Sequence, residues 1–198
     1  KPLTSIPDRF EKYESFGHHN NAKLRSFLDK FKFDYDFISS TEKYKNGFFD
    51  KTIIEILNNY EKILEIILPT LRKERQSTYS PFLPISKKSG NVLQIKIDEY
   101  RPKDNTIIYT EPSDQKKVEV LVTGGNCKLQ WKVDWAMRWF ALDVDFEMYG
   151  KDLIESAILS NKIIKLLGKQ NPTGFAYELF LDEKGEKISK SKGNGITI

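Results

Sequence analysis

The sequence predicts an α/β protein that is interrupted by an antiparallel insertion. Three observations support this fold class. Apolar residues recur at helical spacing early in the chain, short strands between Pro and Gly residues follow, and the last part alternates helices with strands. Strands that alternate with helices are typical of a parallel sheet. We therefore expect residues 1–40 and 128–198 to form one Rossmann-like domain, and residues 41–127 to form an inserted helical and β-rich subdomain.

Two helical patterns occupy the first third of the chain. Apolar side chains over 20–33 recur at helical spacing, and the aromatic residues of 33–37 alternate as in a short strand. After Asp50, a plausible N-cap, a second apolar pattern continues until Pro69. We predict a helix and a strand before the insertion, and one long amphipathic helix at its start.

The remaining pattern is one of short strands followed by alternating helices and strands. In the insertion, strands are predicted at 92–97, 106–110 and 118–122. In the last part we predict a helix at 134–142, a strand at 145–149, a helix at 153–167 and a strand at 176–181.

Composition sets broad limits on function. The 198 residues are 39% hydrophobic, which is enough for one ordinary core, and a net charge of +4 permits a nucleic-acid partner without proving one. The single cysteine, Cys127, excludes an intrachain disulfide and favours a reducing compartment, so the expected location is the cytoplasm. No apolar run reaches the roughly 18 residues of a membrane helix. The chain starts without Met and ends in an apolar stretch, and we expect it to be a piece of a longer protein.

The segment 187–194 is the most specific chemical signal. It is rich in Lys, Ser and Gly and follows the last predicted strand. The ammonium groups of Lys187 and Lys190 can offset charge that develops on a triphosphate, while Ser189, Ser191 and backbone N–H groups fit the phosphate oxygens. Most basic loops are only exposed surface, but the position after a strand favours phosphate binding.

Several segments together resemble the class I lysyl-tRNA synthetases. Residues 187–191, Lys-Ile-Ser-Lys-Ser, are similar to the KMSKS loop of class I synthetases, with Ile188 in the Met position. The other matching segments are 146–153, a strand followed by Gly-Lys-Asp, 131–139, which holds all three tryptophans, 13–22, which holds two adjacent histidines, and 74–81. These segments extend over essentially the entire chain.

The resemblance implies roles for residues at two further places. Gly150 would let the backbone approach adenosine, and Asp152 would accept hydrogen bonds from ribose hydroxyls. On its own, such a Gly-x-Asp segment before a helix is more often a turn with an N-cap.

Lysine's ammonium group requires a carboxylate or aromatic faces. The resemblance places Asp134 in this role, together with Trp131, Trp135 and Tyr177. The alternative is a core helix whose tryptophans only pack, with Asp134 as its cap.

The chain also departs from the family pattern. The HIGH-type signature and the C-terminal anticodon-binding region are absent from these residues. Some relatives carry a cysteine zinc ribbon in the insertion, whereas the turns at 84–90 and 123–126 have no thiolates and only Cys127 lies nearby, so no metal is expected there. For His18 and His19 a structural or substrate-edge role is favoured over a metal site, because adjacent side chains point in different directions.

The implied activity of the whole protein is lysine–tRNA ligation. ATP, with Mg²⁺, would activate L-lysine to lysyl-adenylate, and the acceptor end of tRNA(Lys) would receive the lysyl group. The isolated piece is expected to be inactive. Basic residues of the insertion would contact acceptor-stem phosphates, namely Arg72, Lys73, Arg75, Lys87 and Lys88. Two alternatives remain: a glutamyl-type synthetase, which would need a cation where Asp134 stands, and a non-catalytic tRNA-binding module.

Overall fold

The computed structural model of the chain describes residues 1–188 and 193. The α-helices are α1 (Phe16–Lys30), α2 (Ser40–Lys45), α3 (Asp50–Asn58), α4 (Tyr60–Ile67), α5 (Lys73–Gln76), α6 (Trp131–Leu142) and α7 (Ile154–Leu166). Short 3-10 turns are η1 (Leu3–Ser5), η2 (Leu68–Thr70), η3 (Pro102–Asp104) and η4 (Lys151–Leu153). The strands are β1 (Phe82–Pro84), β2 (Glu99–Arg101), β3 (Thr106–Thr110), β4 (Lys117–Leu121), β5 (Cys127–Leu129), β6 (Phe146–Gly150) and β7 (Thr173–Tyr177). The predicted α/β class is confirmed.

The N-terminal part differs from the prediction at both ends of its helix. Helix α1 begins at Phe16 because Ser15 caps it: the Ser15 hydroxyl oxygen accepts a hydrogen bond from the His18 backbone N–H at 3.2 Å. The strand expected over 33–37 is wrong, since these residues have no regular structure. Alternating aromatic residues make a strand only where a neighbouring strand can pair with them, and none among the described residues does so.

The long helix predicted after Asp50 is two helices. Asp50 is the first residue of α3 and not its N-cap, and Asn59 separates α3 from α4 with φ −106° and ψ 23°. The Asn59 amide donates a hydrogen bond to the Glu55 carbonyl at 3.0 Å. An Asn side chain that bonds the backbone in this way competes with continuation of the helix, which apolar periodicity does not reveal.

Residues 41–127, the expected insertion, contain the predicted antiparallel sheet, with one strand in another place. The sheet order is β2–β3–β4; β3 matches the predicted 106–110 and β4 lies one residue before the prediction. The strand expected at 92–97 is wrong: Val92 makes only an isolated bridge with Ile85, and the strand that pairs with β3 is β2. Strands β1 and β5 pair where the chain enters and leaves the sheet.

The last part follows the predicted helix–strand–helix–strand order. Helix α6 starts three residues earlier than predicted and β7 also starts three residues earlier, while β6 and α7 lie within one residue of the expected positions. Strands β6 and β7 are parallel and are joined through α7, because parallel neighbours need a crossover connection. This is one β–α–β unit, the building block of the Rossmann-like fold that was expected.

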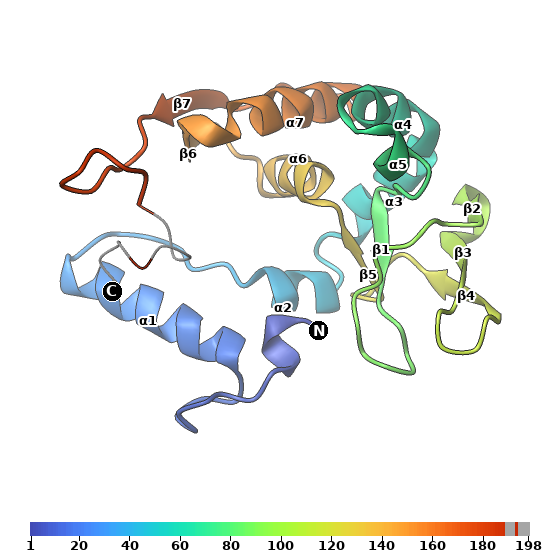
Figure 1. The fold of residues 1–198 in the computed structure, drawn as a ribbon, viewed down its shortest axis with the longest axis horizontal. Coiled ribbons are helices and arrows are strands. Elements are labelled where there is room, and N and C mark those ends of the chain that lie inside the picture. Colours follow the sequence, from blue (N-terminus) through green and yellow to red (C-terminus); the bar gives the residue numbers. More distant parts are fainter. Residues whose placement is uncertain (189–192, 194–198) are drawn as a thin grey trace.

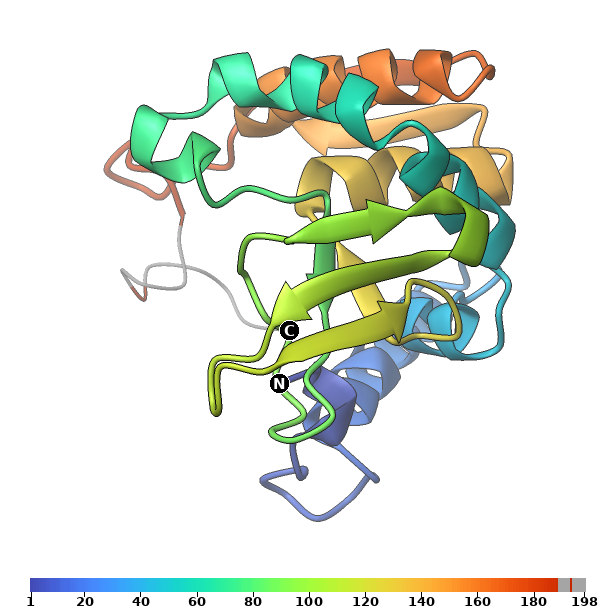
Figure 2. The same cartoon turned by 90° about the vertical axis from the view of Figure 1, so that its right-hand side faces the viewer.

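One apolar cluster extends through the insertion and the last part. It includes Ile53, Ile63, Ile107, Trp139 and Ile163, all at most 2% exposed. Figure 1 shows α7 and α4 along one side of the molecule, α6 beneath them and α1 on the opposite side. Figure 2 shows the β2–β4 sheet from its face. The insertion therefore packs as part of a continuous core.

Candidate active site

The carboxyl ends of β6 and β7 meet at one place. Gly150 ends β6, Tyr177 ends β7, and the two residues are partners in the strand register. A Cβ on Gly150 would lie 2.7 Å from Asp152 Oδ1 and 3.7 Å from a ring carbon of Tyr177. Ligands of open α/β sheets bind at this end of the strands. Glycine at position 150 leaves space beside Asp152 and Tyr177 that a side chain would fill.

 Asp152 and Lys187, which lie 35 residues apart, are in direct contact. The Lys187 ammonium group is 2.7 Å from Asp152 Oδ2, and this hydrogen bond is the main reason that the pKa of Asp152 is lowered. Lys151 pairs with Glu178 at 2.9 Å beside them. Two ion pairs therefore join the turn after β6 to the segment after β7, and they bring the predicted adenosine residues next to the start of the predicted phosphate loop.

A small hairpin precedes that loop. Leu181 and Lys187 form an antiparallel bridge, and the Ile188 backbone N–H donates to the Phe180 carbonyl at 3.1 Å. Asp182 Oδ1 accepts from the backbone N–H groups of Lys184 and Glu186, which closes the turn. The other predicted residues of the loop, namely Ser189, Lys190 and Ser191, lie outside the described residues.

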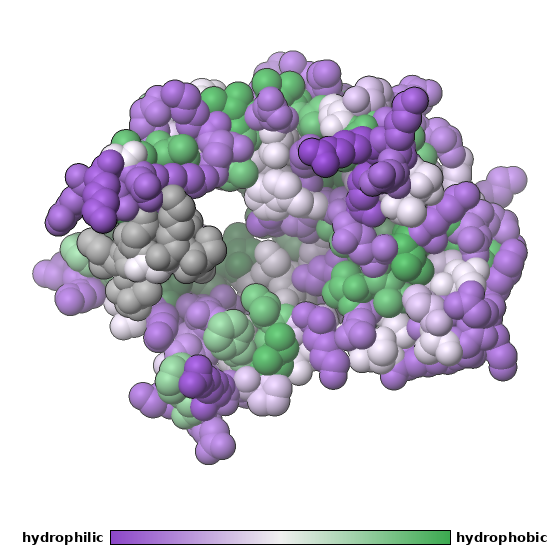
Figure 3. Space-filling model, in the orientation of Figure 1, coloured by the Kyte–Doolittle hydropathy of each residue, from purple (hydrophilic) through white to green (hydrophobic). Residues whose placement is uncertain are grey.

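The tryptophans of α6 form a ladder along one side of a cavity. The ring of Trp131 stacks on that of Trp135 with centroids 4.9 Å apart, and Trp135 lies 4.8 Å from Trp139. The cavity measures about 310 Å³ and is also lined by Tyr177 and Glu147. Figure 3 shows this face of the molecule hollowed between the β6–β7 pair and α1. Three of the four predicted lysine-pocket residues, Trp131, Trp135 and Tyr177, thus line one cavity.

Asp134, the fourth, does not line the cavity. Its Oδ1 accepts a hydrogen bond from the Tyr44 hydroxyl, and its Oδ2 lies 2.9 Å from Arg138 Nε. Burial, and then the neighbouring Asp134 carboxylate, raise the pKa of Tyr44. Asp134 is not the N-cap of α6 either, since Gln130 holds that position. Both of its oxygens are engaged by residues of this chain.

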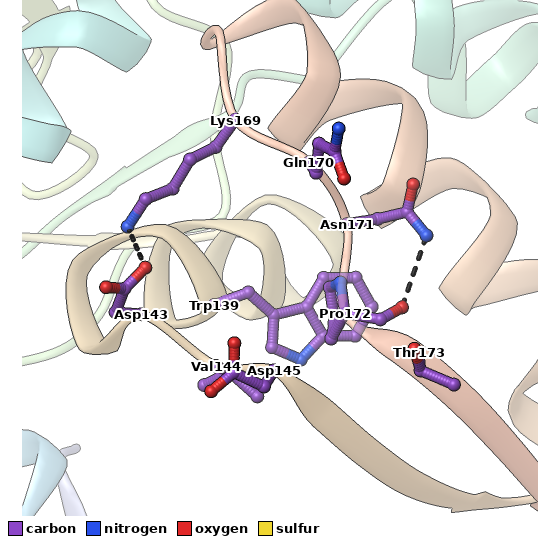
Figure 4. Close-up of a pocket in the computed structure, with 9 residues that line it drawn as sticks. All are labelled: Trp139, Asp143, Val144, Asp145, Lys169, Gln170, Asn171, Pro172 and Thr173. Atoms are coloured by element: carbon purple, nitrogen blue, oxygen red, sulfur yellow. Dashed lines mark hydrogen bonds and ion pairs between the residues drawn. The ribbon is translucent and has the colours of Figure 1, made fainter.

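A second pocket lies at the other end of the same strands. It measures about 300 Å³ and is lined by the segments that precede β6 and β7. Figure 4 shows Lys169 directed at Asp143, with 2.6 Å between the ammonium nitrogen and Oδ1, and Trp139 at the centre of the group. Lys169 also donates to the Phe140 carbonyl. This ion pair closes the amino end of the strands, away from Gly150 and Asp152.

The two histidines have different surroundings. His18 Nδ1 lies 2.8 Å from the Ser15 hydroxyl oxygen, whereas His19 is 6% exposed and its Nδ1 contacts the Asp8 carboxylate. Phe10 stacks on the His19 ring at 5.0 Å. Within the described part of the chain, no group of three or more His, Cys, Asp or Glu side chains could hold a metal ion. No described helix is long and apolar enough to cross a membrane.

Comparison with known families decides the relationship. The family model described as tRNA synthetases class I (K) matches residues 1–198. The chain belongs to this family of class I tRNA synthetases.

Relatives of this synthetase chain bear the name lysine–tRNA ligase. Those of Rickettsia rickettsii strain Sheila Smith and Rickettsia felis are each 57% identical to it over 197 residues, and that of Rickettsia akari is 56% identical. Each match covers 100% of this chain. The chain spans 37–38% of the length of these relatives.

Sequence reasoning missed the carboxylate of this synthetase cavity. Glu147 lies on β6, and its Oε2 accepts hydrogen bonds from the indole N–H groups of Trp135, at 3.3 Å, and Trp139, at 2.6 Å. A signal was available: a charged residue stands in the middle of an otherwise apolar and aromatic strand, two residues before Tyr149, which is on the same side of the strand. Only the fold places this strand beside the tryptophans of α6.

Proposed function

We propose that the full-length protein is a class I lysine–tRNA ligase. It activates L-lysine with ATP to lysyl-adenylate and transfers the lysyl group to the acceptor end of tRNA(Lys), in the cytoplasm. The observation that carries this proposal is the contact between Asp152 and Lys187, which joins the end of the parallel strands to the start of the phosphate loop. Family membership and the names of the relatives support it.

Each part of the site has a proposed task. Gly150 and Asp152 hold adenosine at the strand ends, while Lys187 and Lys190 face the phosphates. Ser189 and Ser191 shape the loop. ATP brings Mg²⁺ on its phosphates, since magnesium is commonly held by substrate phosphates together with one or two carboxylates.

Lysine is proposed to occupy the cavity beside the tryptophan ladder. Trp131, which is 45% exposed, and Tyr177, at 39%, offer accessible aromatic faces for its side chain. In the insertion, basic side chains are proposed to contact acceptor-stem phosphates: Arg72, Lys73, Arg75, Lys87 and Lys88. Lys88 is also paired with Asp114, so its contact with tRNA would compete with that ion pair.

The Lys190→Ala variant tests the loop in the full-length enzyme. Its charge is proposed to act mainly in the transition state of adenylation, so the rate of adenylate formation should fall about 100- to 1,000-fold while the KM for ATP changes modestly. Lysine affinity should change little, because the loop faces phosphates. Pre-steady-state adenylate formation measures this.

A matched control is Lys184→Ala, which removes the same charge from an exposed position of the preceding hairpin. It should stay within about twofold of wild type. A Lys190→Ala rate as high as that of the control would refute the phosphate role of the loop.

A further inference from the structure

We propose that Glu147 is the carboxylate that recognises the side-chain ammonium group of lysine. This inference rests on the proposed function and assigns its specificity to a residue of β6. In the cavity beside the tryptophan ladder, Glu147 contributes a carboxylate among aromatic rings. A carboxylate flanked by aromatic faces is the arrangement that suits a primary ammonium ion.

The two indole groups hold this carboxylate in one orientation. Trp139 is 2% exposed and Trp135 is 5% exposed, so both N–H donors are fixed by packing. Both donate to Oε2, and Oε1 makes no hydrogen bond within the described part of the chain. Two neutral donors leave the carboxylate's negative charge uncompensated by a cation, and one oxygen remains as an acceptor.

The cavity has the size and lining for such a side chain. Its volume of about 310 Å³ falls at the lower end of the roughly 300–1,000 Å³ usual for small-molecule sites. Trp131 and Trp135 stack along one side, and Tyr149 meets the Trp135 ring edge-on at 5.6 Å. The aliphatic carbons of lysine would lie against these rings while the ammonium group reaches Glu147.

The resident cation of the cavity is already neutralised. Arg138 lines it, with its guanidinium 5.8 Å from the centre of the Trp131 ring, but Arg138 is ion-paired with Asp134 at 2.9 Å. Asp134 therefore acts on Arg138, and Glu147 is the carboxylate that lines the cavity. A glutamate substrate, in contrast, would meet the negative charge of Glu147.

The test compares lysine with norleucine, which has the same chain without the ammonium group. In full-length enzyme supplied with ATP and tRNA(Lys), Glu147→Gln should raise the KM for lysine about 100-fold, while the inhibition constant of norleucine and the KM for ATP stay within twofold. Glutamine keeps a carbonyl oxygen for the two indole donors and removes only the charge. The conservative variant Glu147→Asp should keep more of the preference for lysine over norleucine than Glu147→Gln.

Asp143→Asn is the matched control. It removes one carboxylate charge near the start of the same strand, where Asp143 is 85% exposed in its side chain and adopts φ 55°, a conformation that Asn accepts. In Asp143→Asn, the KM for lysine, the inhibition constant of norleucine and the KM for ATP should all stay within twofold of wild type.

Three results would overturn the inference. One is a KM for lysine in Glu147→Gln that stays within threefold of wild type. Another is an equal loss of affinity for lysine and for norleucine in Glu147→Gln, which would make Glu147 a purely structural partner of the indoles. The third is equal preference for lysine in Glu147→Asp and Glu147→Gln. Failure of the proposed function looks different, because wild-type enzyme would then not attach lysine to tRNA(Lys).

Discussion

At the scale of single residues, the buried carboxylate of Asp8 organises the N-terminal segment. Asp8 accepts backbone hydrogen bonds from Phe10 at 3.2 Å and from Lys12 and Tyr13 at 3.0 Å, and it contacts His19 Nδ1. Burial acts to raise the pKa of Asp8, but these hydrogen bonds outweigh it and the pKa is lowered. A carboxyl group with a lowered pKa in the folded state stabilises the fold above its unfolded pKa of about 3.9, and this contribution is lost as the pH falls through the folded value.

We predict that Asp8→Asn lowers the melting temperature of the full-length protein at pH 7. An amide NH₂ group would face backbone N–H donors, and the charge that they stabilise is removed. The difference from wild type should shrink as the pH falls below the unfolded pKa of about 3.9 and through the lower folded pKa of Asp8. Thermal unfolding at pH 7 and pH 3 measures this. Asp34→Asn, at an exposed position, is the control, and an equal effect of both variants at pH 7 would contradict the prediction.

At the scale of elements, the turn between β4 and β5 packs against α2. Gly125 has φ 75°, and a Cβ there would lie 3.3 Å from Lys45 Cγ and 3.4 Å from Lys45 Cα. The neighbouring Gly124 backbone N–H donates to Asp50 Oδ1 at 2.9 Å, which ties the same turn to α3. The β1–β5 pair lies beside this turn, and we propose it as the structural base of the inserted subdomain.

We predict that Gly125→Ala lowers the free energy of unfolding by more than 1 kcal/mol, because a left-handed conformation costs a non-glycine residue about 1–2 kcal/mol and the new methyl group also crowds Lys45. Gly90→Ala separates these two causes, since Gly90 has φ 66° and nothing within 4 Å of an added Cβ. Denaturant unfolding of both variants measures the difference. If Gly90→Ala is as destabilising as Gly125→Ala, contact with α2 has no part in the effect.

At the scale of the whole molecule, the insertion and the β–α–β unit share apolar side chains. Ile63 of α4, Ile107 of β3 and Ile163 of α7 are all completely buried in one cluster. Helix α7 is also tied to α6 by the Ser160 hydroxyl, which contacts the Lys132 carbonyl at 2.8 Å. A shared core predicts that the two parts unfold together.

We predict that Ile163→Ala costs about 2–5 kcal/mol of stability and also speeds amide exchange in β3, although β3 belongs to the insertion. Ile158→Ala makes the same change on the same helix at a residue that is 50% exposed, and it should have a much smaller effect. Hydrogen exchange of both variants decides the matter. Unchanged β3 protection in a destabilised Ile163→Ala protein would mean that the insertion unfolds separately.

Local patterns in the sequence determined those elements whose formation depends mainly on the spacing of their own apolar side chains. Strand β3 and the order of β6, α7 and β7 could be predicted, because periodicity is a local property. Predictions failed where a side chain acts on the backbone or a strand needs a partner. Asn59 interrupts a strongly apolar helical pattern, and no strand among the described residues pairs with 33–37.

Tertiary structure alone decided which polar groups meet. Asp134 stands beside Trp135 in the sequence, yet its carboxylate accepts a hydrogen bond from the distant Tyr44, while Glu147 reaches the indoles from another element. The contact between Asp152 and Lys187 likewise depends on the pairing of β6 with β7. The sequence determined which chemical groups the chain carries, and packing decided which of them share a cavity, because such contacts join residues that are distant along the chain.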